Sequence, residues 1–448
     1  MTAPAGQELR RTLGVPSAAL LVVGGIIGSG IFFTPAEVAR ALPDGTWIFG
    51  VWVLGGLLAL AGALTYAELG AMLPDAGGPY VYIRHAFGSL PAFLYGWMVL
   101  LMIASGAIAA VSLGFAGYVG RFVDLAPLGG PMGVAAATIL LLSATNYLGI
   151  RPGIALQNLL TAAKIVALAV LIVTGLLLWT RLAGPPAIPD APAPPTLLRG
   201  FAAAFVAVLF TIGGWQQMNM IAAEIRDPQR TIPRALLLGI VTVIAIYLGA
   251  NAVYLRALGR DGLAASGAVA ADAMARMIGP AGATFITVAA MLSILGFVNV
   301  AILTNSRLPY ALARDGVFVA AAGRVHPRFG TPHVAIVLLG VWSLVLLVGS
   351  GGRIGTLLSG VVFADWIFFG LGAASVFVLR RRMPDAVRPY RVWGYPVVPA
   401  LFVGAAVVGI ASAFIAAPKT SLLGVAMLVA GAGVHAMFTA RGKHGQQA

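Results

Sequence analysis

Two glycine-rich stretches decide the fold class: Gly24–Phe32, which reads GGIIGSGIF, and Thr211–Gln217, which reads TIGGWQQ. Each lies inside a long apolar run of the kind that crosses a bilayer as a helix. Glycine is the poorest helix former after proline, so these clusters predict main chain that leaves the helix. Non-helical main chain at membrane depth persists only where it lines a cavity or is buried in protein.

The two stretches are about 185 residues apart and fall in corresponding positions, in the first helix of each of two five-helix halves. Paired interruptions of this kind are typical of transporters built from inverted repeats, which hold their substrate between the repeats near the bilayer midplane. The alternative is that the glycines only allow neighbouring helices to approach closely. Two clusters in matching positions favour the first interpretation.

The composition limits the possible classes of protein. The chain has 448 residues, 60% hydrophobic and 9% charged, with a mean hydropathy of +0.96. Soluble globular chains are about 25% charged, and disordered chains are poor in apolar residues, so both classes are excluded. The chain has no cysteine, which excludes disulfides, thiolate metal sites and cysteine nucleophiles.

The sequence predicts an all-α integral membrane protein, because the apolar runs are continuous rather than alternating as in a β-barrel. A spanning helix needs about 20 residues, and the length accommodates about twelve. The predicted spans are 15–40, 46–73, 88–119, 131–149, 154–180, 198–223, 233–256, 281–313, 331–350, 354–379, 395–417 and 420–440.

The basic residues predict the orientation. The formal charge of +14 comes from 28 Lys and Arg against 14 Asp and Glu. With these spans, seventeen of the 28 fall on the side of the N-terminus, nine fall on the other side, and Lys164 and Arg307 lie inside runs. Basic loops stay on the cytoplasmic side, so both termini are expected in the cytoplasm and no nucleic-acid partner is expected. The expected partners are the lipid bilayer and a small substrate.

Short motifs that follow one another from about residue 14 to residue 400 carry a family resemblance. They are Gly24–Phe32, Tyr66–Gly70, Ala76–Tyr80, Phe210–Trp215, Glu224–Pro228, Ile232–Ala235, Ser306–Arg307, Ala313–Gly316, Val325–Arg328 and Arg388–Tyr390. Together they resemble the amino acid–polyamine–organocation (APC) superfamily. The chain is most similar to the L-type amino acid transporters and their bacterial relatives, the light-chain-like members.

The resemblance implies a LeuT-type fold with five-plus-five inverted repeats, broken helices 1 and 6, and two extra helices. The first repeat would span 15–180, the second 198–379 and the two extra helices 395–440. Cytoplasmic tails would cover 1–14 and 441–448. Animal relatives are joined to a heavy chain through a cysteine between spans three and four. This sequence has none there, so a disulfide-linked heavy chain is excluded and a cell (inner) membrane of a prokaryote is expected.

The first break predicts a site for the carboxylate of an amino acid. A helix that begins at the break presents unpaired N–H groups and positive partial charge, which bind anions. The N–H groups of Ser29, Gly30 and Ile31 are the candidates, and Gly28 and Gly30 let a ligand approach the main chain.

The ends of the preceding helices predict a site for the ammonium group. The main-chain carbonyls of Ile26, Ile27 and the region of Phe210 are the candidates. A zwitterion would thus be recognised without burying a charged side chain. The resemblance implies that Phe210 is an aromatic gate over the ligand, the alternative being a core aromatic at a helix end.

Other residues near the breaks are candidates for the side-chain pocket. Gly213, Trp215 and Gln216 belong to the second break, and Asn299 lies in the eighth span. For Asn299 the alternative is an interhelical hydrogen bond. No acidic residue lies near either break, which favours neutral substrates of small or medium size. Asp365 in span ten is an unexplained carboxylate, either a structural acceptor or a partner of Arg353.

Lys164 is the candidate coupling residue. It lies ten residues into span five, about 15 Å deep at a rise of about 1.5 Å per residue, too far for easy snorkelling. Gln157, Thr161 and Lys164 share one helical stripe. The resemblance places the ammonium where sodium-coupled relatives hold Na⁺, near the first break. It would serve there as a fixed charge, as a structural strut, or as a titrating group that couples transport to protons.

The sequence therefore predicts a sodium-independent transporter of neutral, small-to-medium L-amino acids that works by alternating access, as an exchanger or permease. A proton-coupled symporter and a non-transporting amino acid sensor are the alternatives. No enzyme, cofactor or metal is expected, because there is no His cluster or serine-centred motif. Glu68, near the cytoplasmic end of span two, is expected to pair with an arginine.

Overall fold

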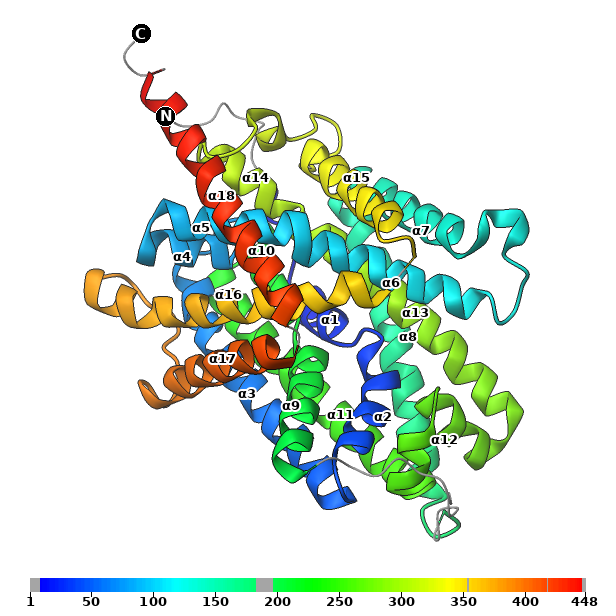
Figure 1. Cartoon of the computed structure of the whole chain (residues 1–448). Coiled ribbons are helices and arrows are strands. Elements are labelled where there is room, and N and C mark those ends of the chain that lie inside the picture. Colours follow the sequence, from blue (N-terminus) through cyan, green and yellow to red (C-terminus); the bar gives the residue numbers. More distant parts are fainter. Residues whose placement is uncertain (1–8, 183–195, 353, 417, 445–448) are drawn as a thin grey trace.

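The protein is a bundle of α-helices, seen in a computed structural model that describes residues 9–182, 196–352, 354–416 and 418–444 (Figure 1). The expected tails fall partly, and Arg353 entirely, outside the described residues. The first half contains α1 (Val15–Ile26), α2 (Gly30–Ala41), α3 (Gly45–Met72), α4 (Pro79–Phe87), α5 (Ser89–Met98), η1 (Val99–Ile103), α6 (Ala104–Val119), η2 (Ala126–Leu128), α7 (Gly130–Tyr147) and α8 (Ile150–Leu177).

The second half is also helical. It contains α9 (Leu197–Ile212), α10 (Gln217–Met220), η3 (Ala222–Glu224), α11 (Pro228–Ala265), α12 (Val269–Ile278), α13 (Pro280–Asn305), α14 (Arg307–Arg314), η4 (Ala320–Gly323), α15 (His333–Gly349), α16 (Ile354–Arg382), α17 (Val397–Ala416) and α18 (Pro418–His444). Within the described residues the β-type pairing is limited to an isolated bridge between Leu13 and Ile225.

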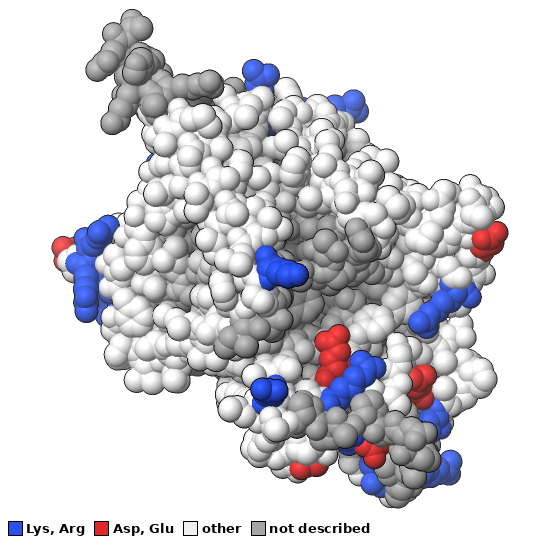
Figure 2. Space-filling view, viewed as in Figure 1, with Lys and Arg blue, Asp and Glu red and all other residues white. Residues whose placement is uncertain are grey.

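The molecule is a multi-pass membrane protein. Among the described residues, nine helices are long and apolar enough to cross a bilayer, and α15 is a shorter apolar helix. Large apolar side chains such as Leu141, Leu177 and Val429 are exposed, which a water-soluble protein avoids on this scale. In Figure 2 the charged side chains of this face gather mainly at the lower right and at the left edge, and broad white areas without charged side chains lie between them and above them. This surface suits lipid rather than water.

Both glycine-rich stretches interrupt their helices. The first helix stops at Ile26 and restarts as α2 at Gly30, and α9 stops at Ile212 before the short α10 begins at Gln217. The α1 segment packs against α8, α10, α11 and α13, and it lies near the middle of the bundle in Figure 1. The first break is therefore surrounded by protein, as main chain outside a helix requires at membrane depth.

Several local features depart from uniform spans. The short helices α4 and α12 lie between predicted spans, and α14 is separated from α13 at Ser306. Residues Val99–Ile103 form a π-helical turn between α5 and α6. Trp342 donates a hydrogen bond to the Leu101 carbonyl at this turn (3.0 Å), so a neighbouring helix satisfies main chain that the turn leaves free.

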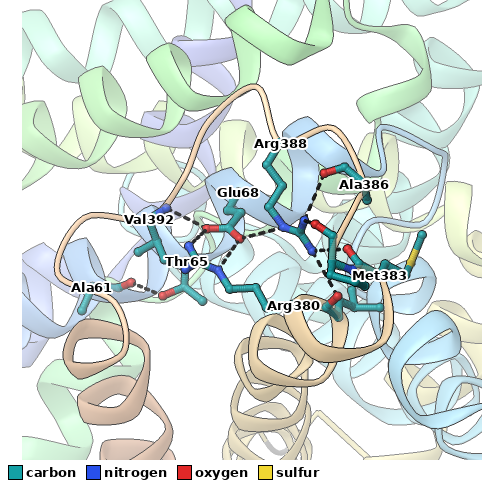
Figure 3. A network of polar contacts seen from close by, with 10 residues as sticks. Ala61, Thr65, Glu68, Arg380, Met383, Ala386, Arg388 and Val392 are labelled. Carbon is teal, nitrogen blue, oxygen red and sulfur yellow. Dashed lines mark hydrogen bonds and ion pairs between the residues drawn. The ribbon is translucent and has the colours of Figure 1, made fainter.

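A polar cluster around Glu68 ties α3 to α16 and to the chain that follows it (Figure 3). The Glu68 carboxylate is buried and accepts hydrogen bonds from Arg380 at 2.9 and 2.7 Å. It also accepts the Val392 N–H at 2.7 Å, and the Arg388 Nε atom lies 3.6 Å away. The arginine partner expected for Glu68 is confirmed. A buried carboxylate with this many donors is well compensated for the water it has lost.

Candidate functional site

The two breaks meet through their main chains. A Cβ atom added at Gly214 would overlap the carbonyl oxygen of Gly25, and one added at Gly25 would lie 2.8 Å from the Gly214 carbonyl oxygen. Gly214 also has φ +107°, a conformation that other residues rarely adopt. Glycine is therefore needed on both sides of this contact, which joins two segments that are far apart in the sequence.

A cavity of about 90 Å³ lies at this meeting point. Its walls come from both breaks and from α6 and α13. The lining residues are Ile26, Gly28, Ser29, Gly30, Ala107, Val111, Phe210, Thr211, Gly213, Gly214, Gln216, Gln217 and Phe297. None of these described residues carries a charge, so the chemistry of the cavity comes from main-chain groups, hydroxyls and amides.

The start of α2 carries main-chain N–H groups that can act as donors. The first hydrogen bond of this helix runs from the Phe32 N–H to the Ser29 carbonyl (3.1 Å). The N–H groups of Ser29, Gly30 and Ile31 come before it, where a helix leaves donors without an intrahelical acceptor. Ser29 and Gly30 line the cavity. Such a helix start favours a bound anion.

The position of α2 is fixed by α9. The hydroxyl groups of Thr34 and Thr211 are 2.7 Å apart, which joins the two helices beside the cavity. A Cβ atom at Gly30 would lie 2.6 Å from the Thr211 Cγ2 atom. The absence of a side chain at Gly30 thus permits both the close approach of α9 and access to the main chain of α2.

The carbonyl groups of the first break already have partners. The Ile26 oxygen accepts from the Gly28 N–H (2.9 Å) and from the Tyr247 hydroxyl (3.2 Å). The Ile27 oxygen accepts from Lys164 (2.5 Å) and from the Ser293 hydroxyl (3.1 Å). The ammonium site predicted at Ile26 and Ile27 stays a prediction, and Ile26 is the one of the two that lines the cavity.

Lys164 lies directly behind the first break. Its side chain is fully buried, and its ammonium donates to the carbonyls of Gly24 (3.3 Å), Ile27 (2.5 Å) and Ser293 (3.3 Å). An ammonium has three donors, and here each has a main-chain acceptor. The charge therefore links α8 to α1 and α13 through carbonyl dipoles, without an anionic partner among these contacts.

The polar stripe that continues along α8 also contacts the first break. Gln157 and Thr161 are buried and joined by a hydrogen bond of 3.1 Å. A Cβ atom at Gly24 would lie 2.6 Å from the Thr161 hydroxyl oxygen. The first of the four glycines thus provides helix packing, whereas Gly28 and Gly30 provide access to the cavity.

Two predicted pocket residues point elsewhere. Trp215 is buried and stacks edge-on against Tyr66 (4.9 Å between ring centroids) and Phe402 (5.7 Å). Asn299 bonds to Asn146 (2.9 Å), to Gln157 (2.9 Å) and to a main-chain carbonyl. Trp215 packs in an aromatic cluster, and Asn299 makes the interhelical hydrogen bonds that the sequence left open as its alternative.

Sequence reasoning missed several lining residues. Ala107 and Val111 lie on α6, Thr211 and Gln217 flank the second break, and Phe297 lies on α13. Thr211 and Gln217 are the two ends of the second glycine-rich stretch, so their position in the sequence was a usable signal. Nothing in the sequence of an apolar helix marks Phe297, because its place depends on the direction in which α13 turns it.

A second cavity of about 340 Å³ lies between α4, α14 and the segment before α1. Its walls carry charge: Arg84 pairs with Asp315 at 2.5 Å, and the Tyr80 hydroxyl donates to Asp315 at 2.6 Å. Burial, and then this hydrogen bond, raise the pKa of Tyr80 above its ordinary value, so the hydroxyl keeps its proton. None of the described residues that line this second cavity belongs to either helix break.

A multi-pass helical bundle that holds a cavity between two facing helix breaks has the architecture of a membrane transporter. Comparison with known proteins defines the kind of transporter. The sequence model of the family described as "Amino acid permease" matches residues 13–437. The chain therefore belongs to the amino acid permease family, within the APC superfamily, and is an amino acid transporter.

Individual relatives agree with this assignment. The human "Large neutral amino acids transporter small subunit 2" is 33% identical over 406 residues, 89% of this chain and 75% of the relative. The human "b(0,+)-type amino acid transporter 1" is 33% identical over 395 residues, 87% and 80% of the two chains. The "Serine/threonine exchanger SteT" of Bacillus subtilis (strain 168) is 31% identical over 431 residues, 95% and 96% of the two chains.

Proposed function

We propose that this chain is a sodium-independent exchanger of neutral, small-to-medium L-amino acids, and neither an enzyme nor a ligand sensor. The observation that carries the proposal is the Lys164 ammonium on the carbonyls of Gly24 and Ile27. A cation that is part of the chain organises the broken helix, so no sodium ion is needed there. The serine/threonine exchanger named above supports exchange, and it matches nearly the whole chain.

The lining of the cavity supports neutral substrates. Ser29 and Gly30 offer N–H groups to a carboxylate, and Ile26 and Phe210 supply the main-chain carbonyls considered for the ammonium. No described lining residue would pair with a charged side chain on the substrate. An isolated charge buried here would remain uncompensated, which is costly at membrane depth.

The proposed architecture has twelve spans in a LeuT-type arrangement. Residues 15–180 and 198–379 form the inverted five-helix repeats, and 395–440 form two further helices. The breaks at α1–α2 and α9–α10 support this pairing, because each opens the first helix of its half. The termini would be cytoplasmic, in the inner membrane of a bacterial cell, and no disulfide to a partner chain is possible because there is no cysteine.

Alternating access is supported by a contrast between the side of the bundle that carries the N-terminus and the cavity between the breaks. At the N-terminal end, Leu13 pairs with Ile225 through main-chain bonds, and Thr12 and Leu13 donate to the Glu224 carbonyl at 2.8 and 3.0 Å. The Glu224 carboxylate forms a fully buried ion pair with Arg307 at 2.7 Å. At the cavity, by contrast, Phe210 is 41% exposed. This conformation is tied shut on the side of the N-terminus.

The test is uptake of radiolabelled L-alanine into proteoliposomes that contain the purified full-length chain. Vesicles are preloaded with L-alanine or left empty, with sodium or choline as the cation, and with or without an imposed pH gradient. We expect uptake only in preloaded vesicles, equally in sodium and choline, and without a requirement for external acid. Empty liposomes are the control.

Each other outcome would assign a different function to this chain. Uptake into empty vesicles driven by external acid means a proton symporter. A requirement for sodium contradicts the role of Lys164. Binding of L-alanine by the purified chain, with no uptake under any condition, means a sensor.

A further inference from the structure

We propose that Phe297 determines the upper size limit of the substrate side chain. This inference rests on the proposed function, since it concerns the same cavity. Phe297 comes from α13, and its half-buried ring forms part of the cavity wall. A Cβ atom added at Gly28 would lie 3.2 Å from the ring, so the aromatic side chain packs directly against the main chain of the first break.

The backbone that carries the ring is held in place by Ser293, one turn earlier on the same helix. Ser293 precedes Phe297 by four residues, so both side chains lie on the same face of α13. The Ser293 hydroxyl donates to the carbonyls of Ile27 (3.1 Å) and Gly28 (2.9 Å). These bonds fix this face of α13 against the break, and Phe297 with it.

The remainder of α13 is anchored on its other sides. A Cβ atom at Gly296 would lie 3.2 Å from the Lys164 ammonium, so α8 approaches the helix closely there. Asn299 bonds to Asn146 and Gln157, at 2.9 Å in each case. Hydrogen bonds made by Ser293, one turn before the ring, and by Asn299, two residues after it, therefore hold α13 in place on both sides of Phe297.

The other large side chains in the wall are less suited to this role. Gln216 accepts the Gly214 N–H (3.0 Å), which ties its side chain to the second break. Gln217 accepts from the Thr304 hydroxyl (3.3 Å). Phe210 is 41% exposed and lies at the open side. On α6 the wall is made of Ala107 and Val111, which are small.

These observations assign the limit to one fixed apolar ring in a cavity of about 90 Å³. A packed interior does not expand freely, so a substrate with a longer side chain meets this ring before it meets a movable group. Replacing the ring with a methyl group opens space directly beside Gly28. The substrate class follows: alanine- and serine-sized side chains are accepted by this chain, and leucine- and phenylalanine-sized ones are excluded by Phe297.

The experiment measures exchange of radiolabelled L-alanine in preloaded proteoliposomes in competition with L-alanine, L-serine, L-valine, L-leucine or L-phenylalanine. In the unmodified chain we expect leucine and phenylalanine to inhibit at least about 10-fold more weakly than alanine, a typical discrimination for one or more extra methylene groups. Phe297→Ala should remove that difference, and Phe297→Leu should reduce it. Phe297→Trp should extend the exclusion to valine.

Phe285→Ala is the matched control, because Phe285 lies on the same helix but is exposed outside the cavity. It should leave the inhibition ratios unchanged. Ligand-induced shifts in melting temperature give the same ratios for any variant that has lost transport. Normal alanine exchange with unchanged ratios in the Phe297 variants overturns this inference but leaves the proposed function intact. Failure of the unmodified chain to exchange or bind any of the five amino acids overturns both.

Discussion

At the scale of single residues, the site depends on main chain without side chains. Gly214 combines a positive φ of 107° with a position at which any Cβ atom overlaps the Gly25 carbonyl. A side chain there must push the two breaks apart as well as strain the backbone. The contact between the two helix breaks thus depends on glycine, the residue that has no side chain.

Gly214→Ala should therefore lower stability and abolish transport. The left-handed conformation alone costs about 1–2 kcal/mol for a residue other than glycine, and the overlap adds to it. The measurement is the melting temperature of the purified chain, together with alanine exchange. The control is Gly50→Ala in α3, where no atom lies within 4 Å of the added Cβ. That variant should keep full activity and an equal or higher melting temperature, since alanine favours helix by about 1 kcal/mol.

Lys164→Ala should sharply reduce transport and lower the melting temperature of the purified protein. The ammonium makes three hydrogen bonds to main-chain carbonyls, and bonds to a charged group contribute about 1.5–3 kcal/mol each. Loss of this link frees the first break, so exchange should fall at least about 10-fold. Lys419→Ala is the matched control because Lys419 is exposed. Normal exchange by Lys164→Ala, at a normal protein level, would show that the ammonium is only structural.

The sequence predicted which residues are near the breaks better than it predicted where they point. Ser29, Gly30 and Gln216 line the cavity, as their positions beside the glycines suggested. Trp215 is next to Gln216 in sequence, but it turns into an aromatic cluster with Tyr66. Neighbours in sequence lie on different faces wherever the chain turns, so distance along the chain does not determine direction.

At the scale of helices and turns, a buried ion pair connects η3 to α14. Glu224 ends η3, just after the second break, and Arg307 begins α14. Both side chains are fully buried, and Arg307 donates to both carboxylate oxygens, at 2.7 and 3.1 Å. Because the Glu224 carbonyl also accepts two N–H groups from the segment before α1, one residue ties three elements together.

Glu224→Ala should be strongly destabilising, because it leaves the Arg307 charge buried without its partner. Breaking a buried pair in this way costs about 3–5 kcal/mol. The melting temperature of the purified protein and its yield should both fall. Asp261→Ala removes the acid of the pair with Arg260, and because the Asp261 side chain is 51% exposed this should change stability by less than about 1 kcal/mol. Equal effects of the two substitutions would contradict this account.

The sequence predicted the long elements well because each is a continuous apolar run. Helix α3 (Gly45–Met72) matches the span predicted at 46–73 to within one residue at each end, and α13 begins at Pro280, one residue before the predicted start, but ends at Asn305 rather than at 313. It did not predict α4 or α12, which carry mixed polar and apolar residues in short segments between spans. The π-helical turn at Val99–Ile103 was also missed. The Leu101 carbonyl accepts a hydrogen bond from Trp342, in a distant part of the chain, and the Leu100 carbonyl accepts one from Ser105, so the turn depends partly on a tertiary contact that the local sequence does not reveal.

At the scale of the whole molecule, the side of the membrane on which each basic loop lies depends on the number of helices that cross the membrane before it. Seventeen of the 28 basic residues fall on the side of the N-terminus only if an odd number of spans, seven in the predicted arrangement, separates the loop before α7 from the loop after α16. One span more or fewer would place the arginines at 380–391 on the opposite side. The positive-inside rule then assigns the more basic side to the cytoplasm. The orientation of the two loops therefore tests whether the number of spans between them is odd.

The absence of cysteine makes that test direct, since single cysteines can be introduced into an otherwise unchanged chain. Val123 lies in the loop before α7 and Val387 in the loop after α16, and both side chains are exposed. In intact cells a membrane-impermeant maleimide should label Val123→Cys but not Val387→Cys, which should react only after the membrane is permeabilised. The unmodified chain should remain unlabelled throughout. The reverse pattern would mean inverted insertion, and labelling of both from one side would mean that the number of spans between them is even.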